Sequence, residues 1–431
     1  MKYISLNKKA EAVNFRGAVV RGLAPDKGLY YPQEIPQLDP VYFDEIQQFS
    51  DHELALEAIR QYIGEEIPLS RLSTIVEQTL SFEFPVVEVE DGISVLELYH
   101  GPTLAFKDVG ARFMARCLGY FNETESNHKI TVLVATSGDT GGAVADGFFG
   151  VDGVEVVILY PKGKVSEIQE QQLTTHGGNV RALEVDGTFD DCQGMVKQAF
   201  LDQEILAKRP MTSANSINVA RWMPQMFYYL SAARQLGTDQ KLVFAVPSGN
   251  FGNICAGMLA TKMGLPVHHF ITGTNANSVV PDYLGGKPYV PKPSVPTLSN
   301  AMDVGDPSNF IRIRALYDFD EALLRENLSG YAFDDQLTLK AIREVYGQNE
   351  YLMEPHGAIG YLALKSYLGQ HSEPVKAVFL ETAHPVKFLD VMPSELVDQI
   401  IVPEGIKALA NKAKHKTAIR DYQDLKSILM D

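Results

Sequence analysis

The sequence is poor in cysteine and in long apolar runs. The three cysteines, Cys117, Cys192 and Cys255, are widely spaced and odd in number, so they fit neither a disulfide framework nor a paired-cysteine metal site. The longest uncharged window, Leu242 to Thr261, has proline and polar residues in its middle, which argues against a membrane span. Residues 1–9 lack the apolar core of a signal peptide. We therefore expect a protein of the reducing cytoplasm.

Positive charge is also scarce, with 38 Lys and Arg residues against 54 Asp and Glu residues and a formal net charge of −16. This balance argues against nucleic acid or an anionic membrane as a partner. It leaves room for a small anionic substrate, which would need a local pocket of cations. A monomer and a small homo-oligomer are both compatible with this composition.

Common nucleotide and metal motifs are missing. GxGxxG and HExxH are absent, and the only approach to GxxxxGK[ST] has Pro281 in place of its first glycine and Pro288 after the lysine. His268 and His269 are adjacent, and neighbouring residues of a strand point to opposite faces, so we interpret them as structural histidines. We expect no metal. A nicotinamide-binding or non-catalytic α/β protein is the weaker alternative.

Strands and helices alternate from residue 86 onward, which predicts parallel sheets covered by helices on both faces. The predicted strands are residues 86–89, 93–98, 130–135, 154–160, 180–186, 241–246, 267–272 and 375–380. The expected fold is α/β, with two open, mostly parallel sheets and a small N-terminal helical domain. We predict domains at 1–90, 91–240 and 241–431, with a Pro- and Gly-rich insertion at about 274–307 and a peripheral helical tail at 402–430.

Lys107 has an unusual position for a lysine. Apolar residues recur at helical spacing from Phe106 to Phe121, so Lys107 lies in the first turn of a helix, at the edge of its apolar stripe, and Thr103 is the expected N-cap. The positive end of the helix dipole and the loss of water both favour a neutral amine, which makes Lys107 a candidate Schiff-base nucleophile. Most lysines are solvated surface groups, so this hypothesis needs support from the rest of the chain.

Two predicted strand–loop–helix units carry glycine-rich loops. Thr136 to Gly142 reads TSGDTGG, and Pro247 to Asn253 reads PSGNFGN. Such loops present backbone N–H groups to an anion, although each alone is equally compatible with a tight turn. A third polar segment, Glu381 to Lys387, follows an apolar strand, at the edge where open α/β sheets bind ligands. The two glycine-rich loops together predict a ligand with two anionic ends or two anionic ligands.

The order and spacing of these motifs closely resemble the threonine synthase family in its long bacterial and fungal class, within the pyridoxal-phosphate enzymes of the tryptophan-synthase-β fold type. The resemblance extends over essentially the whole chain. Its matching stretches are Arg16-Gly17 with Gly22 to Asp26, Gly101 to Asp108, Ala135 to Gly141, Pro247 to Asn253 and Thr382 to Pro385. One departure is Lys27, where the family pattern leads us to expect glycine.

The resemblance implies pyridoxal 5′-phosphate as the cofactor and assigns roles to single residues. Lys107 would hold the cofactor and transfer protons, and Thr382 would meet the pyridine nitrogen, with Glu381 as a rival. The cofactor phosphate would bind at Gly249, Asn250, Phe251, Gly252 and Asn253. The substrate carboxylate would bind at Ser137, Gly138, Asp139, Thr140 and Gly141. Related loops often carry asparagine in place of Asp139, so we expect this carboxylate to point away or to accept backbone hydrogen bonds.

The implied reaction converts O-phosphohomoserine and water to threonine and phosphate, the last step of threonine biosynthesis. A dianionic phosphate on an acidic protein needs local cations. We expect Lys387 and Arg221 to be the first candidates and Arg112 the next, although surface ion pairs are the commoner role for such residues. A serine or threonine dehydratase, or another β-eliminating enzyme with the same cofactor, is the alternative function.

Overall fold

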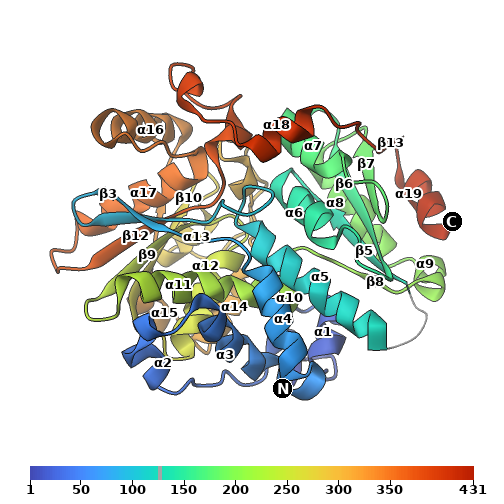
Figure 1. Cartoon of the computed structure of the whole chain (residues 1–431), viewed down its shortest axis with the longest axis horizontal. Coiled ribbons are helices and arrows are strands. Elements are labelled where there is room, and N and C mark those ends of the chain that lie inside the picture. Colours follow the sequence, from blue (N-terminus) through green and yellow to red (C-terminus); the bar gives the residue numbers. More distant parts are fainter. Residues whose placement is uncertain (125–128) are drawn as a thin grey trace.

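The computed structural model describes residues 1–124 and 129–431, which form two mostly parallel sheets surrounded by helices (Figure 1). In the view of Figure 1 the six-stranded sheet lies on the left and the five-stranded sheet on the right. A further pair, β1 (Tyr3–Ser5) and β2 (Tyr30–Pro32), is antiparallel. The predicted α/β class with two mostly parallel sheets is confirmed.

The six-stranded sheet has the order β11-β10-β9-β12-β4-β3. Its strands are β3 (Val86–Glu90), β4 (Ile93–Glu97), β9 (Leu242–Pro247), β10 (Val267–Thr274), β11 (Leu328–Ala332) and β12 (Lys376–Glu381). All neighbours are parallel except β3 and β4, which form the predicted hairpin around Asp91 and Gly92. Strand β9 is buried along its whole length, as expected for a strand that is covered on both faces.

The five-stranded sheet has the order β13-β7-β6-β5-β8 and is parallel throughout. Its strands are β5 (Ile130–Ala135), β6 (Val154–Pro161), β7 (Val180–Val185), β8 (Met211–Thr212) and β13 (Lys416–Ile419). The prediction of a purely helical tail was wrong at β13, which pairs with β7 at the sheet edge. Only Ile419 of this strand is buried, so the sequence carries no apolar alternation that would have revealed it.

Helices cover both sheets and form the N-terminal layer. Those before the second sheet are α1 (Phe15–Arg21), α2 (Val41–Asp44), α3 (Asp51–Ile63), α4 (Leu69–Thr79) and α5 (Lys107–Thr124). The central ones are α6 (Asp139–Phe148), α7 (Glu167–Thr174), α8 (Phe189–Ala199), α9 (Gln203–Lys208), α10 (Val219–Trp222), α11 (Met226–Leu236) and α12 (Gly252–Lys262). The last are α13 (Val279–Leu284), α14 (Phe310–Leu316), α15 (Glu321–Asn327), α16 (Asp335–Asn349), α17 (Pro355–Leu368), α18 (Glu404–Ala410) and α19 (Tyr422–Met430).

The sheets and the core cross the domain limits expected from the sequence. Strand β4 pairs with β12, which is almost 280 residues later in the chain. The N-terminal helices share one hydrophobic cluster with α5 and with α10 to α12, and the ring of Phe15 lies 6.2 Å from that of Phe121. The expected insertion at 274–307 is also partly ordered, because it contains α13 and is tied together by the amide of Asn275, which donates to Thr297 and Asp303.

Candidate active site

Lys107 is held at the carboxyl edge of the six-stranded sheet. The segment before it pairs with the chain that follows β12: Ala105 forms a β-bridge with Ala383, and the Phe106 N–H donates to the Thr382 carbonyl at 2.9 Å. Helix α5 then begins at Lys107 itself. The lysine therefore projects from a helix start that is fixed on a strand end.

The first turn of α5 is organised by Asp108. Its carboxylate accepts the Thr103 N–H at 2.9 Å and the Thr103 hydroxyl, so Thr103 is a partner of Asp108 and the N-cap prediction was wrong. The extra residues between Thr103 and Lys107 place that hydroxyl too far before the helix to cap it. Burial raises the pKa of Asp108 to about 6.

Asp139 approaches Lys107 from the other sheet. Strand β5 ends at Ala135, and the Thr136 hydroxyl oxygen accepts the N–H groups of Gly138 and Gly141, which shapes the loop before α6 begins at Asp139. The Asp139 carboxylate lies 2.8 Å from Lys387 Nζ and 3.9 Å from Lys107 Nζ. In the described chain its hydrogen-bond partners are the side chains of Lys387 and Gln169, not backbone N–H groups, and its orientation away from a substrate carboxylate stays a prediction.

The surroundings of Lys107 oppose a positive charge on its amine. Burial is the main reason that its pKa is lowered, and the charges of Lys387 and Arg221 act in the same direction. Asp139 and Glu354 partly offset this effect. Its side chain keeps 17% of its surface exposed, so the residue is not completely enclosed by the protein.

The loop between β9 and α12 is built to hold an anion. Phe251 has a left-handed backbone (φ 60°), and α12 begins at the next residue. Within the described chain, the backbone N–H groups from Gly249 to Asn253 donate to no acceptor, and the side-chain amide nitrogen of Asn253 is buried without a partner. A Cβ at Gly249 would lie only 2.7 Å from the Ala301 carbonyl oxygen, so this close approach requires glycine. These features fit a phosphate group.

Some members of this loop have partners elsewhere. The Asn250 side-chain oxygen accepts the Ser308 N–H at 2.7 Å, and the Asn253 side-chain oxygen accepts the Tyr229 hydroxyl at 2.7 Å. Phe251 is buried against the ring of Phe310, with centroids 5.8 Å apart. Side chains of the loop therefore fix its shape, while its backbone N–H groups remain available to bind an anion.

Thr382 and Glu381 diverge as neighbouring residues of an extended chain do. The Thr382 hydroxyl donates to Glu354 Oε1 at 3.4 Å. Glu381 Oε1 accepts the Glu354 N–H at 2.6 Å, while its Oε2 is buried without a partner beside Gly357, under the start of α17. Burial, followed by the charge of Glu354, raises the pKa of Glu381 well above its usual range, which favours the neutral form of this carboxyl. Of the two residues, Thr382 is the one that carries a hydroxyl donor, and this hydroxyl contacts the Glu354 carboxylate.

The three candidate cations have different surroundings. Lys387, in the short helix η5 (Pro385–Phe388), is fully buried and donates to Asp139 and to the Thr103 carbonyl. Arg221 is buried, donates to the Ala214 carbonyl and has its pKa lowered to about 10 by burial, while its Nε is buried without a partner. Arg112 donates to the Gln78 carbonyl at 2.9 Å and is drawn toward α4.

Two polar residues of the site escaped the sequence reasoning. Glu354 is fully buried and caps α17, where it accepts the N–H groups of His356 and Gly357. An acidic residue directly before Pro355 is a helix-start signal that could have identified it. Gln169 donates to Asp139 at 2.9 Å, and nothing local in the sequence indicates that contact.

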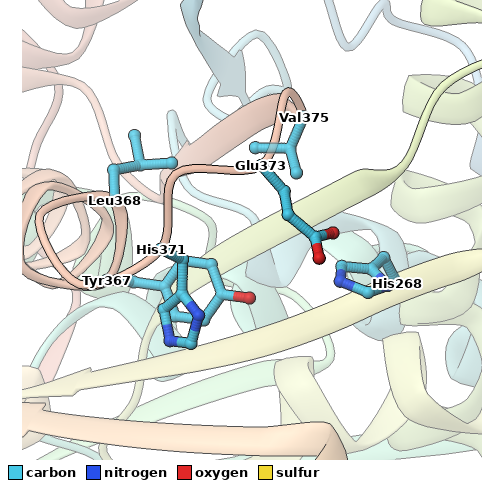
Figure 2. A pocket seen from close by; sticks show the side chains of 6 residues that line it. All are labelled: His268, Tyr367, Leu368, His371, Glu373 and Val375. Carbon is cyan, nitrogen blue, oxygen red and sulfur yellow. The ribbon is translucent and has the colours of Figure 1, made fainter.

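A second polar region lies at the opposite, amino edge of the six-stranded sheet. His268, His371 and Glu373 line a cavity of about 60 Å³ together with Tyr367, Leu368 and Val375 (Figure 2). His269 instead stacks on Tyr367 with centroids 4.9 Å apart. Among the described residues, no cluster of His, Cys, Asp and Glu side chains is arranged to hold a metal ion.

Comparisons with known proteins cover the whole chain. The pyridoxal-phosphate dependent enzyme family matches residues 84–382, the threonine synthase N terminus matches 2–80, and the threonine synthase C-terminal region matches 357–429. Threonine synthase from Serratia marcescens is 42% identical, with 100% of this chain and 99% of the relative covered.

Solved structures agree with the sequence matches. Threonine synthase from Escherichia coli has a TM-score of 0.90 at 40% identity, with 100% of this chain and 99% of that chain covered. The pyridoxal-phosphate-bound threonine synthase from Brucella melitensis has a TM-score of 0.91 at 34% identity, with 100% and 98% covered. A tomato threonine deaminase shares only the fold, at a TM-score of 0.56 and 16% identity. In the part of the chain that the structure describes, no helix is long and apolar enough to cross a membrane.

Proposed function

We propose how the site residues share the catalytic work, from the premise that this chain belongs to the threonine synthase family and is a pyridoxal-phosphate-dependent enzyme that makes threonine. The proposed substrates are O-phosphohomoserine and water, and the proposed products are threonine and phosphate. The observation that carries the proposal is the amine of Lys107, which lies 3.9 Å from Asp139 at the point where the carboxyl edges of the two sheets meet.

The cofactor would be held at three places. Lys107 would bind its carbonyl carbon, the loop from Gly249 to Asn253 would bind its phosphate, and the Thr382 hydroxyl would meet its ring nitrogen. The unengaged backbone N–H groups of that loop support the phosphate position. Bound pyridoxal phosphate supplies an electron sink that stabilises negative charge on substrate carbons.

The substrate carboxylate would bind at the start of α6, in the loop from Ser137 to Gly141. Thr136 engages the N–H groups of Gly138 and Gly141, whereas those of Ser137, Asp139 and Thr140 donate to no acceptor in the described chain. The hydroxyls of Ser137 and Thr140 can add further donors. A carboxylate bound here would hold the substrate on the side of the site where Asp139, the first residue of α6, lies 3.9 Å from the Lys107 amine.

Lys107 would move the protons of the reaction. A lowered pKa provides the neutral amine that can remove a proton from carbon, and the resulting ammonium can return a proton later. The amine is carried by the first residue of α5, and the chain just before it is paired with the end of β12.

The substrate phosphate would be attracted by the nearby cations Lys387 and Arg221. Direct contact would require Lys387 to exchange Asp139 or the Thr103 carbonyl for phosphate, and Arg221 to exchange the Ala214 carbonyl. Arg221 Nε, which is buried without a partner, has a hydrogen to donate. We also place the enzyme in the cytoplasm, which is consistent with its three free, buried cysteines.

One assay tests this function. The purified, cofactor-loaded protein is incubated with O-phosphohomoserine, and phosphate, threonine and keto acid are measured. We expect phosphate and threonine in equal amounts. Phosphate with a keto acid in place of threonine would favour the dehydratase-like alternative, and no phosphate release would refute the proposed substrate.

A further inference from the structure

We propose that Asp139 is a positioning residue that stabilises the protonated form of Lys107, and that Lys387 and Gln169 hold its carboxylate in the ionised state needed for this task. The inference rests on the proposed function, in which Lys107 carries the cofactor and transfers protons. It gives a purpose to a carboxylate in a loop that would otherwise repel an anionic substrate.

The two oxygens of Asp139 have different surroundings. Oδ1 is anchored by Lys387 Nζ at 2.8 Å and by the Gln169 amide at 2.9 Å. Oδ2 is 3.9 Å from Lys107 Nζ and accepts no hydrogen bond from the described residues. One oxygen is therefore fixed by the protein, and the other is directed at the amine.

The ion pair spans the two halves of the site. Asp139 begins α6 on the five-stranded sheet, whereas Lys387 belongs to η5, beyond the end of β12. The Lys387 side chain is fully buried, and that of Asp139 is 5% exposed. Breaking such a pair costs stability, but replacing both partners by neutral groups of similar size is often tolerated.

Among the described residues, the charged groups with the largest effect on the pKa of the Lys107 amine come from four elements. They are Asp139 of α6, Lys387 of η5, Arg221 of α10 and Glu354 at the N-cap of α17. Burial works against ionisation of Asp139, but the adjacent Lys387 and Lys107 lower its pKa far below the usual range. Asp139 therefore remains a carboxylate throughout the working pH range.

In this proposal Lys107, and not Asp139, carries the proton that is transferred. When the Lys107 amine takes a proton from substrate carbon, the new N–H bond makes an ammonium, and Asp139 remains an anion beside it. When the ammonium returns that proton to carbon, the neutral amine is restored. Asp139 takes no proton in either direction. Asp139 lowers the free energy of the Lys107 ammonium, and the positive charge of Lys387 reduces the size of this stabilisation.

The test measures the ionisation of Lys107 directly. The full-length chain, freed of cofactor, is treated with an amine-acylating reagent at several pH values, and modification of Lys107 is read by peptide mass spectrometry. The neutral-pH rate is divided by the rate at strongly alkaline pH, which removes differences in access. Circular dichroism checks that each variant is folded.

Removal of the two charges should move this ratio in opposite directions. D139N removes the anion, so the ratio should rise about tenfold, because an opposite charge at this distance favours the ammonium. K387M removes a competing cation, so the ratio should fall by a similar factor. The double variant, which leaves no unpaired buried charge, should stay within about threefold of the wild type.

The E170Q variant is the control. It removes a carboxylate next to Gln169 that pairs with Lys414 and Lys416, and it should leave the ratio unchanged.

Other results would contradict the inference. If the pair of Asp139 and Lys387 were only a structural link, D139N and K387M would both loosen the site and shift the ratio in the same direction, which would overturn the inference. If D139N does not fold, the comparison of K387M with the double variant decides, and equal ratios would overturn it. Attachment of the cofactor to a different lysine would instead refute the proposed site.

Discussion

At the carboxyl edge of the six-stranded sheet, Lys387, Glu354 and Glu381 are at most 1% exposed, whereas at the amino edge the side chains of Lys241 and Glu373 are 48% and 61% exposed. Both edges gather charged groups. Only at the carboxyl edge do these groups give up water, and each therefore needs a specific partner.

The cost of that burial is visible in individual groups. Glu381 has a raised pKa and an oxygen without a partner, and the pKa values of Lys107 and Asp139 are both lowered. At the amino edge, Glu373 is paired with Lys241 in solvent, where such a pair contributes little. The comparison teaches that a polar cavity alone does not identify a site, whereas buried and perturbed charges at a strand end do.

The largest expected effect is on activity, and it is tested by replacing one lysine at each edge of the six-stranded sheet. K107A removes the amine that would bind the cofactor and transfer protons, so kcat should fall by at least about a thousandfold and the cofactor absorbance band should be lost. K241A, at the amino edge, should retain wild-type kcat and absorbance. Substantial turnover by K107A would remove the central residue from the mechanism.

The two ends of α17 offer a second contrast, in stability. At Gly357 an added Cβ would lie 1.4 Å from Glu381 Oε2, so G357A should lower the free energy of unfolding by about 3 kcal/mol through overpacking. Gly369 has a φ of −66°, and a Cβ added there would lie 3.4 Å from its nearest neighbour, the Lys365 carbonyl oxygen, so alanine fits. G369A should therefore change the free energy of unfolding by no more than about 1 kcal/mol. Urea denaturation measures both, and equal effects would mean that the carboxyl edge is not tightly packed.

The third prediction concerns how the stability contributed by Asp108, at the carboxyl edge, depends on pH. The pKa of Asp108 is raised to about 6, so the native state binds a proton that the unfolded state has lost between pH 4 and 6. Its contribution to the unfolding free energy must therefore fall as the pH rises through this window, by about 3 kcal/mol. The stability difference between D108N and the wild type should change across that window and be flat above it. A difference that does not vary with pH would mean that Asp108 is ionised at pH 4.

The smallest expected effect is at the amino edge. Glu373 is largely exposed to solvent, and its hydrogen bond with Lys241 lowers its pKa. E373Q should leave kcat and KM within about twofold of the wild type, because it alters an exposed pair far from Lys107. Steady-state kinetics measures this, and a clear loss of activity would show that the cavity of Figure 2 has a functional role.

The sequence predicts the fold well where burial leaves a pattern. The apolar runs of β5, β9 and β12 and the Asp91-Gly92 turn indicate strands and a hairpin, and all are found. Strand β13 was missed because its residues are polar and exposed, and it depends on pairing with β7. The family resemblance gave the cofactor and the reaction, which periodicity alone does not contain.

The site was predicted as a set of residues but not as a set of contacts. Lys107, Asp139 and Lys387 were all named from the sequence, and the structure brings them together. Their mutual distances depend on two sheets meeting, and Asp139 and Lys387 are separated by 248 positions in the chain. No local pattern encodes such a contact, so the pairing of Asp139 with two lysines emerged only from the structure.

The central claim, that Lys107 carries the cofactor, is tested most directly by borohydride reduction of the cofactor-loaded protein followed by peptide mass spectrometry. Reduction converts the bond between the lysine and pyridoxal phosphate into a stable amine, so the modified residue is identified without an activity assay. We predict that the mass of the reduced cofactor is found on the peptide that contains Lys107. Its appearance on another lysine such as Lys387, or on none, would contradict this account.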